Sequence, residues 1–209
     1  MKTNTIYSKL RTPLLLLAFF LFSLAAEATH FRYMSVNWQI TSYTATTRTV
    51  QFNITQSWRK TAYFPLATNA IGQTFNVGPF SYGDASSVNL ILTVTSQNNT
   101  EDWIVGTVTL TKTYTTLSNV TASFSGCCRI STLLEGQNDD SFLAQTIVTL
   151  SDPTNASPVT NTPPILYGQT GLPAATVQIN ATDPDNDPLT FALATTALNG
   201  MAPAVPSIV

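Results

Sequence analysis

The stretch TVQFNIT, residues 49–55, places an apolar side chain at every second position, with Gln, Asn and Thr between them. Alternation with a period of two is typical of a β-strand with one buried and one solvated face. The pattern recurs at Val36/Trp38/Ile40, Val50/Phe52/Ile54, Val88/Leu90/Leu92/Val94, Val120/Ala122/Phe124, Ile147 to Leu150, Val177/Ile179/Ala181 and Leu189/Phe191/Leu193. No stretch keeps a 3.6-residue apolar period, so we expect few and short helices. The sequence therefore predicts an all-β fold.

Turn-forming residues separate these predicted strands, at Gly78-Pro79, Tyr82-Gly83-Asp84, Gln97-Asn98-Asn99 and Gly136-Gln137-Asn138-Asp139. Short strands with turn signals at this spacing favour an antiparallel, immunoglobulin-like β-sandwich. Residues 29–151 are long enough for about seven to nine strands, by the usual size of such domains. We therefore expect this range to form one sandwich domain.

The chain is poor in charge and rich in Thr. It has 9 Lys and Arg, 11 Asp and Glu, 35 Thr and 17 Ser in 209 residues. Charged residues make up 10% of the chain, whereas about 25% is usual for a soluble domain. Binding of nucleic acid through its phosphates needs clustered Lys and Arg. The composition therefore argues against a nucleic-acid partner, and the abundant β-branched Thr again favours strands.

The N-terminus has the form of a secretory signal peptide. Lys2, Lys9 and Arg11 precede an apolar run from Leu14 to Ala25, and the small-x-small triplet 26–28 follows. The run is 12 residues long, and spanning a bilayer takes about 20. We therefore expect residues 1–28 to be removed and the product to be secreted or held at the cell surface. No second apolar run of spanning length follows, so no transmembrane segment is expected after cleavage.

Residues 152–164 read DPTNASPVTNTPP, with four prolines and one charged residue. This composition is typical of a stiff, extended linker. The remaining residues, 165–209, are too few for an independent sandwich. We expect either that the chain is cut from a longer protein or that this piece completes a sheet elsewhere. The first is favoured, because residues 202–209 show no closing strand.

Little in the sequence points to catalysis. His30 is the single histidine, and a general base also needs an orienting partner that the sequence does not reveal. The adjacent pairs Glu101-Asp102 and Asp139-Asp140 would point to opposite faces of a strand, which does not suit acid/base chemistry on one bond. No nucleophile elbow, P-loop or dinucleotide fingerprint occurs. We therefore predict a protein that is not an enzyme.

Cys127 and Cys128 are the two cysteines of the chain, and they are adjacent. In an oxidising secretory compartment they could form a vicinal disulfide that stiffens the loop. Alternatively, one could pair with another chain, or both could remain thiols. A redox role is less expected than a structural one, because the spacing is not C-x-x-C.

The segment Asp183 to Pro188 reads DPDNDP and places three carboxylates, Asp183, Asp185 and Asp187, within five residues. Such a cluster repels itself unless a cation lies among the carboxylates, and Ca²⁺ accepts six to eight oxygen ligands. No Lys or Arg follows Arg129 to neutralise it. The two hypotheses are a Ca²⁺ site completed by ligands from elsewhere and a solvated turn, because Asp, Asn and Pro also form turns.

Five Asn-x-Ser/Thr triplets are candidate glycosylation sites, at Asn53, Asn98, Asn119, Asn155 and Asn180. They matter where the host glycosylates secreted proteins. Glycans there would help to keep a surface of low charge soluble.

Two families are similar to parts of this sequence. The segment DPDNDPLTF, Asp183 to Phe191, resembles the D-P-D-G-D-x-L-x-[FY] segment of cadherin-like and related immunoglobulin-like repeats, with Asn186 in place of Gly. The resemblance implies that residues 165–209 are an incomplete cadherin-like unit and that the three Asp residues bind Ca²⁺ between modules. Residues 80–84 and 112–114 resemble the F-G-D-G and H-T-Y segments of polycystic-kidney-disease (PKD) β-sandwiches, imperfectly in both cases.

Residues 30–38 and 127–130 are also similar to the opening module of multi-domain surface proteins built from such repeats. We therefore predict a non-catalytic adhesion or recognition module that contacts a protein or glycan at a cell surface. The alternative is a carbohydrate-binding module, in which Trp38, Trp58 and Trp103 would supply flat faces for sugar rings. Trp38 alternates with core residues and is expected to be buried, whereas Trp58 and Trp103 lie beside charged residues and are expected to be partly exposed.

Overall fold

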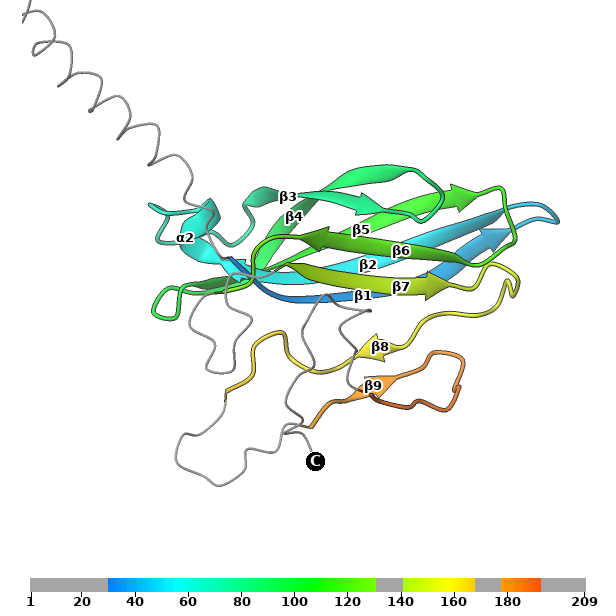
Figure 1. Cartoon of the computed structure of the whole chain (residues 1–209). Helices are drawn as coiled ribbons and strands as arrows, with labels where there is room; N and C mark the ends of the chain where they lie inside the picture. Colours follow the sequence, from blue (N-terminus) through cyan, green and yellow to red (C-terminus); the bar gives the residue numbers. More distant parts are fainter. Residues whose placement is uncertain (1–29, 131–140, 168–177, 193–209) are drawn as a thin grey trace, which may run out of the picture.

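The computed structural model describes residues 30–130, 141–167 and 178–192. In this part of the chain the helical structure is the four-residue α2 (Lys60–Tyr63). The strands are β1 (Phe31–Tyr43), β2 (Arg48–Arg59), β3 (Thr74–Ser81), β4 (Ser87–Asn98), β5 (Trp103–Tyr114), β6 (Val120–Gly126), β7 (Phe142–Val148), β8 (Val159–Thr160) and β9 (Ala181–Thr182) (Figure 1). The prediction of an all-β fold is confirmed.

Strands β1 to β7 form one antiparallel sheet in the order β1-β2-β5-β4-β3-β6-β7. β3 pairs with β4 along its length and with β6 only near its end, at Phe80 and Ser81. Its register shifts between Asn76 and Gly78, where Gly78 has a φ of 108°. This bulge allows β3 to bend from one layer to the other. The two layers of the sandwich are thus joined through β3.

The end strands β1 and β7 lie side by side, so the sheet curls almost into a barrel (Figure 1). The indole Nε1 of Trp38 on β1 donates hydrogen bonds to the carbonyl O of Ile147 at 3.0 Å and to Oγ1 of Thr146 at 3.2 Å, both on β7. Near the start of β1, the amide of Phe31 donates to the carbonyl O of Cys128 at 3.1 Å. These contacts hold the two layers together along one side.

The core follows the alternation of the sequence. Val50, Phe52 and Ile54 on β2 are at most 1% exposed, and Trp38 is 3% exposed, as predicted. At one end of the core the rings of Phe31 and Phe142 stack with their centroids 3.7 Å apart. Burial of these apolar side chains is the main favourable contribution to folding of the sheet.

The segment that follows β7 returns along the free edge of β1. Within the predicted linker, the amide of Ser157 donates to the carbonyl O of Trp38 at 2.9 Å, and the amide of Trp38 donates to Oγ of Ser157 at 2.7 Å. Val159 and Thr160 then form β8, which pairs with β9. Part of the Pro-rich stretch therefore lies against the sandwich.

The alternation at Leu189 and Phe191 does not produce a strand in the described residues. Residues 183–192 lie outside any strand, and Phe191 is 58% exposed. A strand needs a partner for its backbone groups and a second layer for its apolar face. Neither is present beside this segment in the described part of the chain.

Residues 1–28, the predicted signal peptide, lie outside the described residues. Within the described ranges, no helix has the length and apolar character needed to cross a membrane.

Candidate ligand-binding surfaces

The segment between β2 and β3, residues 60–73, is held by hydrogen bonds from side chains to its backbone groups. Lys60 is buried, and its ammonium donates a hydrogen bond to the carbonyl O of Ala67. Gln97 on β4 donates from Nε2 to the carbonyl O of Thr68 at 2.9 Å and accepts from the amide of Ala70 at 2.6 Å. Hydrogen bonds from side chains of neighbouring elements therefore fix the backbone of this loop.

Aromatic side chains anchor the first half of the same loop. The ring centroid of Tyr63 lies 4.7 Å from that of Phe75, and the ring centroid of Phe64 lies 5.8 Å from that of Phe75. Burial raises the pKa of Tyr63 to about 12. The phenol therefore remains neutral throughout the physiological range.

The loop also has a polar anchor beside β5. The carboxylate of Asp102 accepts hydrogen bonds from the amide of Thr61 at 2.8 Å and from its hydroxyl at 2.7 Å. The guanidinium Nε of Arg59 lies 3.8 Å from the same carboxylate. Asp102 has a φ of 55°, a conformation that Asp tolerates better than most residues.

This loop presents apolar side chains to solvent. Leu66 is 95% exposed and Ile71 is 54% exposed. Residues 61–73 carry no charged side chain. Neither the alternation nor the motifs of the sequence pointed to this surface. A run of 13 uncharged, non-alternating residues between two strand patterns was the available signal.

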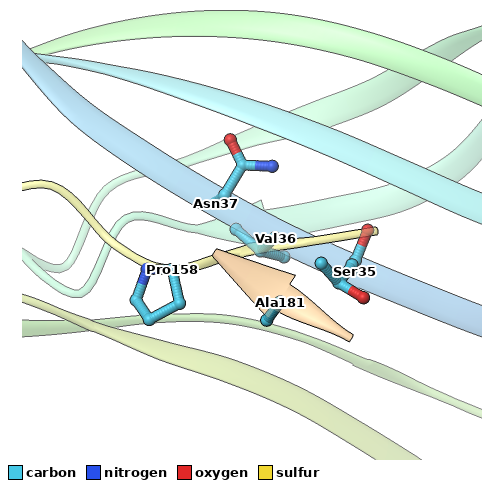
Figure 2. A pocket seen from close by; sticks show the side chains of 6 residues that line it. Ser35, Val36, Asn37, Pro158 and Ala181 are labelled. Atoms are coloured by element: carbon cyan, nitrogen blue, oxygen red, sulfur yellow. The ribbon is translucent and has the colours of Figure 1, made fainter. Parts of the chain in front are cut away.

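A second surface is a groove along the free edge of β1. One wall is formed by Ser35, Val36 and Asn37 of β1. The other wall is formed by Pro158, which precedes β8, by Thr160 on β8 and by Ala181 on β9. Figure 2 shows Val36 and Ser35 on β1 across from Pro158 and Ala181. The groove has a volume of about 200 Å³, and none of its lining residues is charged.

The two stretches with PKD-like motifs meet in space. Nζ of Lys112 lies 2.8 Å from Oδ2 of Asp84, and the hydroxyl of Tyr114 donates to the carbonyl O of Tyr82 at 2.9 Å. Burial acts to raise the pKa of Asp84, but hydrogen bonds from Lys112 and Ser86 outweigh it and lower that pKa to about 2. The contacts fix the turn between β3 and β4. The PKD and cadherin resemblance stays a prediction.

The three predicted calcium ligands form a turn. Oδ1 of Asp183 accepts hydrogen bonds from the amides of Asp185 at 2.8 Å and Asp187 at 3.3 Å. Oδ2 of Asp185 accepts from the amide of Ala156 at 2.7 Å. Among the residues that the structure describes, no three His, Cys, Asp or Glu side chains come together as a metal site. These residues alone do not fit a Ca²⁺ shell, and calcium binding stays a prediction.

Cys127 and Cys128 are joined by a vicinal disulfide in the structure. Cys128 is 5% exposed, and its carbonyl O accepts hydrogen bonds from the amides of His30 at 3.0 Å and Phe31 at 3.1 Å. The bridge thus lies where the end of β6 meets the start of β1. Its formation in the secreted product stays a prediction.

The predicted glycosylation sites differ in accessibility. Asn119 and Asn180 are exposed, and Asn98 and Asn155 are half-buried. Asn53 lies within β2, and its Nδ2 donates to Oδ1 of Asn37 at 3.1 Å. A glycan at Asn53 would have to replace that hydrogen bond.

The expectation that Trp58 is partly exposed is wrong. Trp58 is 5% exposed, and its Nε1 donates to Oε1 of Gln56 at 2.7 Å. Charged neighbours in sequence misled the prediction, because adjacent residues on a strand point to opposite faces and Lys60 is itself buried. Trp103 is half-buried, and its Nε1 donates to Glu101 at 2.8 Å. Trp58 therefore offers no exposed face to a sugar ring, and the carbohydrate-binding alternative stays a prediction.

Known proteins match much of the chain. A family described as "Integrin beta-like protein A-E, N-terminal" matches residues 32–151. The chain is 34% identical to integrin beta-like protein C over 134 residues and 32% identical to integrin beta-like protein B over 162 residues. It is 28% identical to integrin beta-like protein A over 187 residues. All three relatives are from Dictyostelium discoideum.

These alignments cover 57%, 72% and 81% of this chain and only 7%, 8% and 9% of proteins C, B and A. The chain thus spans less than a tenth of the length of these curated relatives. No solved structure matches it.

Proposed function

Since this chain belongs to the family of integrin beta-like protein A–E N-terminal domains, we propose that it is a non-catalytic adhesion or recognition module. In this proposal the module acts outside the cell or at the cell surface and binds a macromolecular ligand there. The predicted signal peptide supports the extracellular location. The antiparallel sheet supports the role in binding, because rigid sandwiches of this kind commonly carry binding residues on their loops.

The observation that carries the proposal is the exposed position of Leu66 on a fixed loop. A Leu that is 95% exposed contributes nothing to the core. The loop around it is nevertheless held by Lys60, Gln97 and Asp102. A contact residue on a pre-organised loop loses little conformational entropy on binding. We therefore place the adhesive contact at Leu66, and Ile71, five residues later on the same loop, is 54% exposed.

The proposal is tested by attachment of beads, coated with the secreted chain, to living Dictyostelium cells. We expect Leu66→Asp to lower attachment by about tenfold or more, because burial of a Leu side chain is worth about 1.5–3 kcal/mol. The melting temperature of this variant should be unchanged, since the side chain lies outside the core.

Ile147→Asp is the matched control, because Ile147 is 63% exposed on β7 and lies outside the 60–73 loop. It should attach like the wild type. Equal attachment of Leu66→Asp and wild type would show that the 60–73 loop does not make the adhesive contact. If wild-type beads attach no more strongly than beads coated with unfolded chain, the proposed adhesive function is wrong.

A further inference from the structure

We propose that the free edge of β1 at Met34 and Val36 binds a short, extended segment of a partner protein by strand addition. This inference goes beyond the adhesive contact at Leu66, because it concerns a different element and a different chemistry. It rests on the hydrogen-bonding direction of β1 and on the groove beside it.

The direction of the backbone groups of β1 follows from Trp38. Both the amide and the carbonyl of Trp38 bond to Ser157, on the side of β1 away from β2. In an antiparallel pair, alternate residues direct both groups to the same side. The register with β2 is unbroken from Tyr33 to Ile40, so Val36 and Met34 direct theirs away from β2 as well.

This part of the edge has no strand partner in the described residues. The described backbone bonds of β1 on that side are made at Phe31, with Cys128 and Ile130, and at Trp38, with Ser157. Residues 33–37 carry no charge and no Pro, the features by which proteins usually protect exposed edges. Within the described residues, the edge at Met34 and Val36 therefore has backbone groups that another strand could pair with.

The segment that follows β7 pairs with the edge of β1 only briefly. The bridge between Gln39 and Ala156 and the bonds of Ser157 begin an antiparallel ladder along β1. The ladder does not continue beyond Ser157, because Val159, the next residue whose backbone groups would face β1, pairs with Thr182 of β9 instead. Pro158 and Ala181 stand across the groove from Val36 (Figure 2). An added segment would continue the ladder that Ser157 begins.

The shape and chemistry of the groove define its occupant. Its volume of about 200 Å³ and its small, uncharged lining suit a few residues of extended peptide with small, uncharged side chains such as Ala, Ser, Thr and Val. A second copy of β1 fits poorly, because the paired strands β8 and β9 form the outer wall. Main-chain hydrogen bonds would supply the affinity, and the wall would select side-chain size.

The test uses an array of octapeptides composed of Ala, Ser, Thr and Val, probed with the secreted chain. We expect a subset to bind. Val36→Pro removes the outward amide hydrogen without breaking a bond to β2, whereas Val36→Ala keeps it and serves as the matched control. Val36→Pro should weaken binding of the best octapeptide about tenfold relative to Val36→Ala. Ala181→Phe, which fills the groove from β9, should also block binding.

Two further measurements keep the inference falsifiable if Val36→Pro does not fold. The best octapeptide is made with N-methyl groups on its odd or its even residues, and one of the two versions alone should bind. Hydrogen exchange of the Met34 and Val36 amides should slow when the octapeptide is added. The inference would be overturned if no octapeptide bound or if the two N-methylated versions behaved equally. It would also be overturned if the wild type were a dimer that Val36→Pro converted to monomers. Attachment through Leu66 should be unchanged by Val36→Pro, so the two proposals fail separately.

Discussion

The β1–β7 sheet and the segment from 152 to 192 use the same sequence alternation with opposite results. In the sheet, Phe52 and Leu92 are fully buried, because a second layer covers them. In the later segment, Ile179 is 48% exposed and Phe191 is 58% exposed, and the regular structure in its described residues, 152–167 and 178–192, is the two-stranded sheet of β8 and β9. The difference shows that alternation specifies which face a strand would bury. Burial itself needs another layer.

The largest expected contrast is between Phe52→Ala and Ile179→Ala. The ring of Phe52 lies 5.5 Å from that of Phe80, so truncation leaves a cavity between the two layers. We expect the free energy of unfolding to fall by about 3–5 kcal/mol for Phe52→Ala. It should change by less than about 0.5 kcal/mol for Ile179→Ala. Urea denaturation of the two variants measures both values, and similar losses would contradict the distinction between the regions.

Gly72 and Gly83 have the same backbone conformation but different surroundings. Gly83 and Gly72 both have a φ of 82°. A Cβ on Gly83 would lie 2.5 Å from the carbonyl O of Thr121, whereas a Cβ on Gly72 would meet nothing within 4 Å. We expect Gly72→Ala to cost about 1 kcal/mol from the backbone conformation alone and Gly83→Ala at least about 2 kcal/mol. Equal midpoints in urea would show that the turn at Gly83 is not packed against β6 as described.

The third prediction concerns the ion pair that closes the β3–β4 turn. The folded-state pKa of Asp84 is about 2, below its unfolded value of about 3.9. The stabilisation is therefore complete above pH 5 and is lost as the pH falls through about 4 towards 2. We expect a loss of about 1–2 kcal/mol, since the pair is partly exposed. Asp84→Asn should remove this part of the acid dependence, and an unaltered acid profile in that variant would contradict the assignment.

The smallest effect is expected at the contact between the two regions. Asp185→Ala removes the acceptor of the Ala156 amide. Because this hydrogen bond is exposed, we expect a loss of about 1 kcal/mol or less. The loss is measured by limited proteolysis at a site after residue 151, which should be slower in the wild type than in Asp185→Ala. Asp187→Ala is the control.

A thermal melt with millimolar Ca²⁺ tests the calcium prediction. That prediction requires Ca²⁺ to raise the melting temperature of the wild type but not that of Asp185→Ala.

The alternation in the sequence predicted parts of β1, β2, β4 and β6 and much of the core, but it did not predict β3 or β5. Alternation predicted the buried faces of β2 and β4, because side-chain direction on a strand depends only on position. It did not reveal Leu66, because the loop is held by Gln97, about 30 residues away in sequence. It did not reveal the groove either, since its walls meet through a contact between Trp38 and Ser157, 119 residues apart. Trp58 was misplaced because its charged neighbours were weighed above its register on β2.

The central claim is that the contact surface at Leu66 is built into the fold and exists before any ligand binds. Residue-resolved hydrogen exchange of the free chain tests this most directly. The amides of Ala70 and Gly72, which donate to Gln97 and to the carbonyl O of Val94, should exchange nearly as slowly as the amide of Phe52 in the middle of β2. Exchange at the rate of an unstructured peptide would show that the loop is ordered only on binding, and would contradict the account.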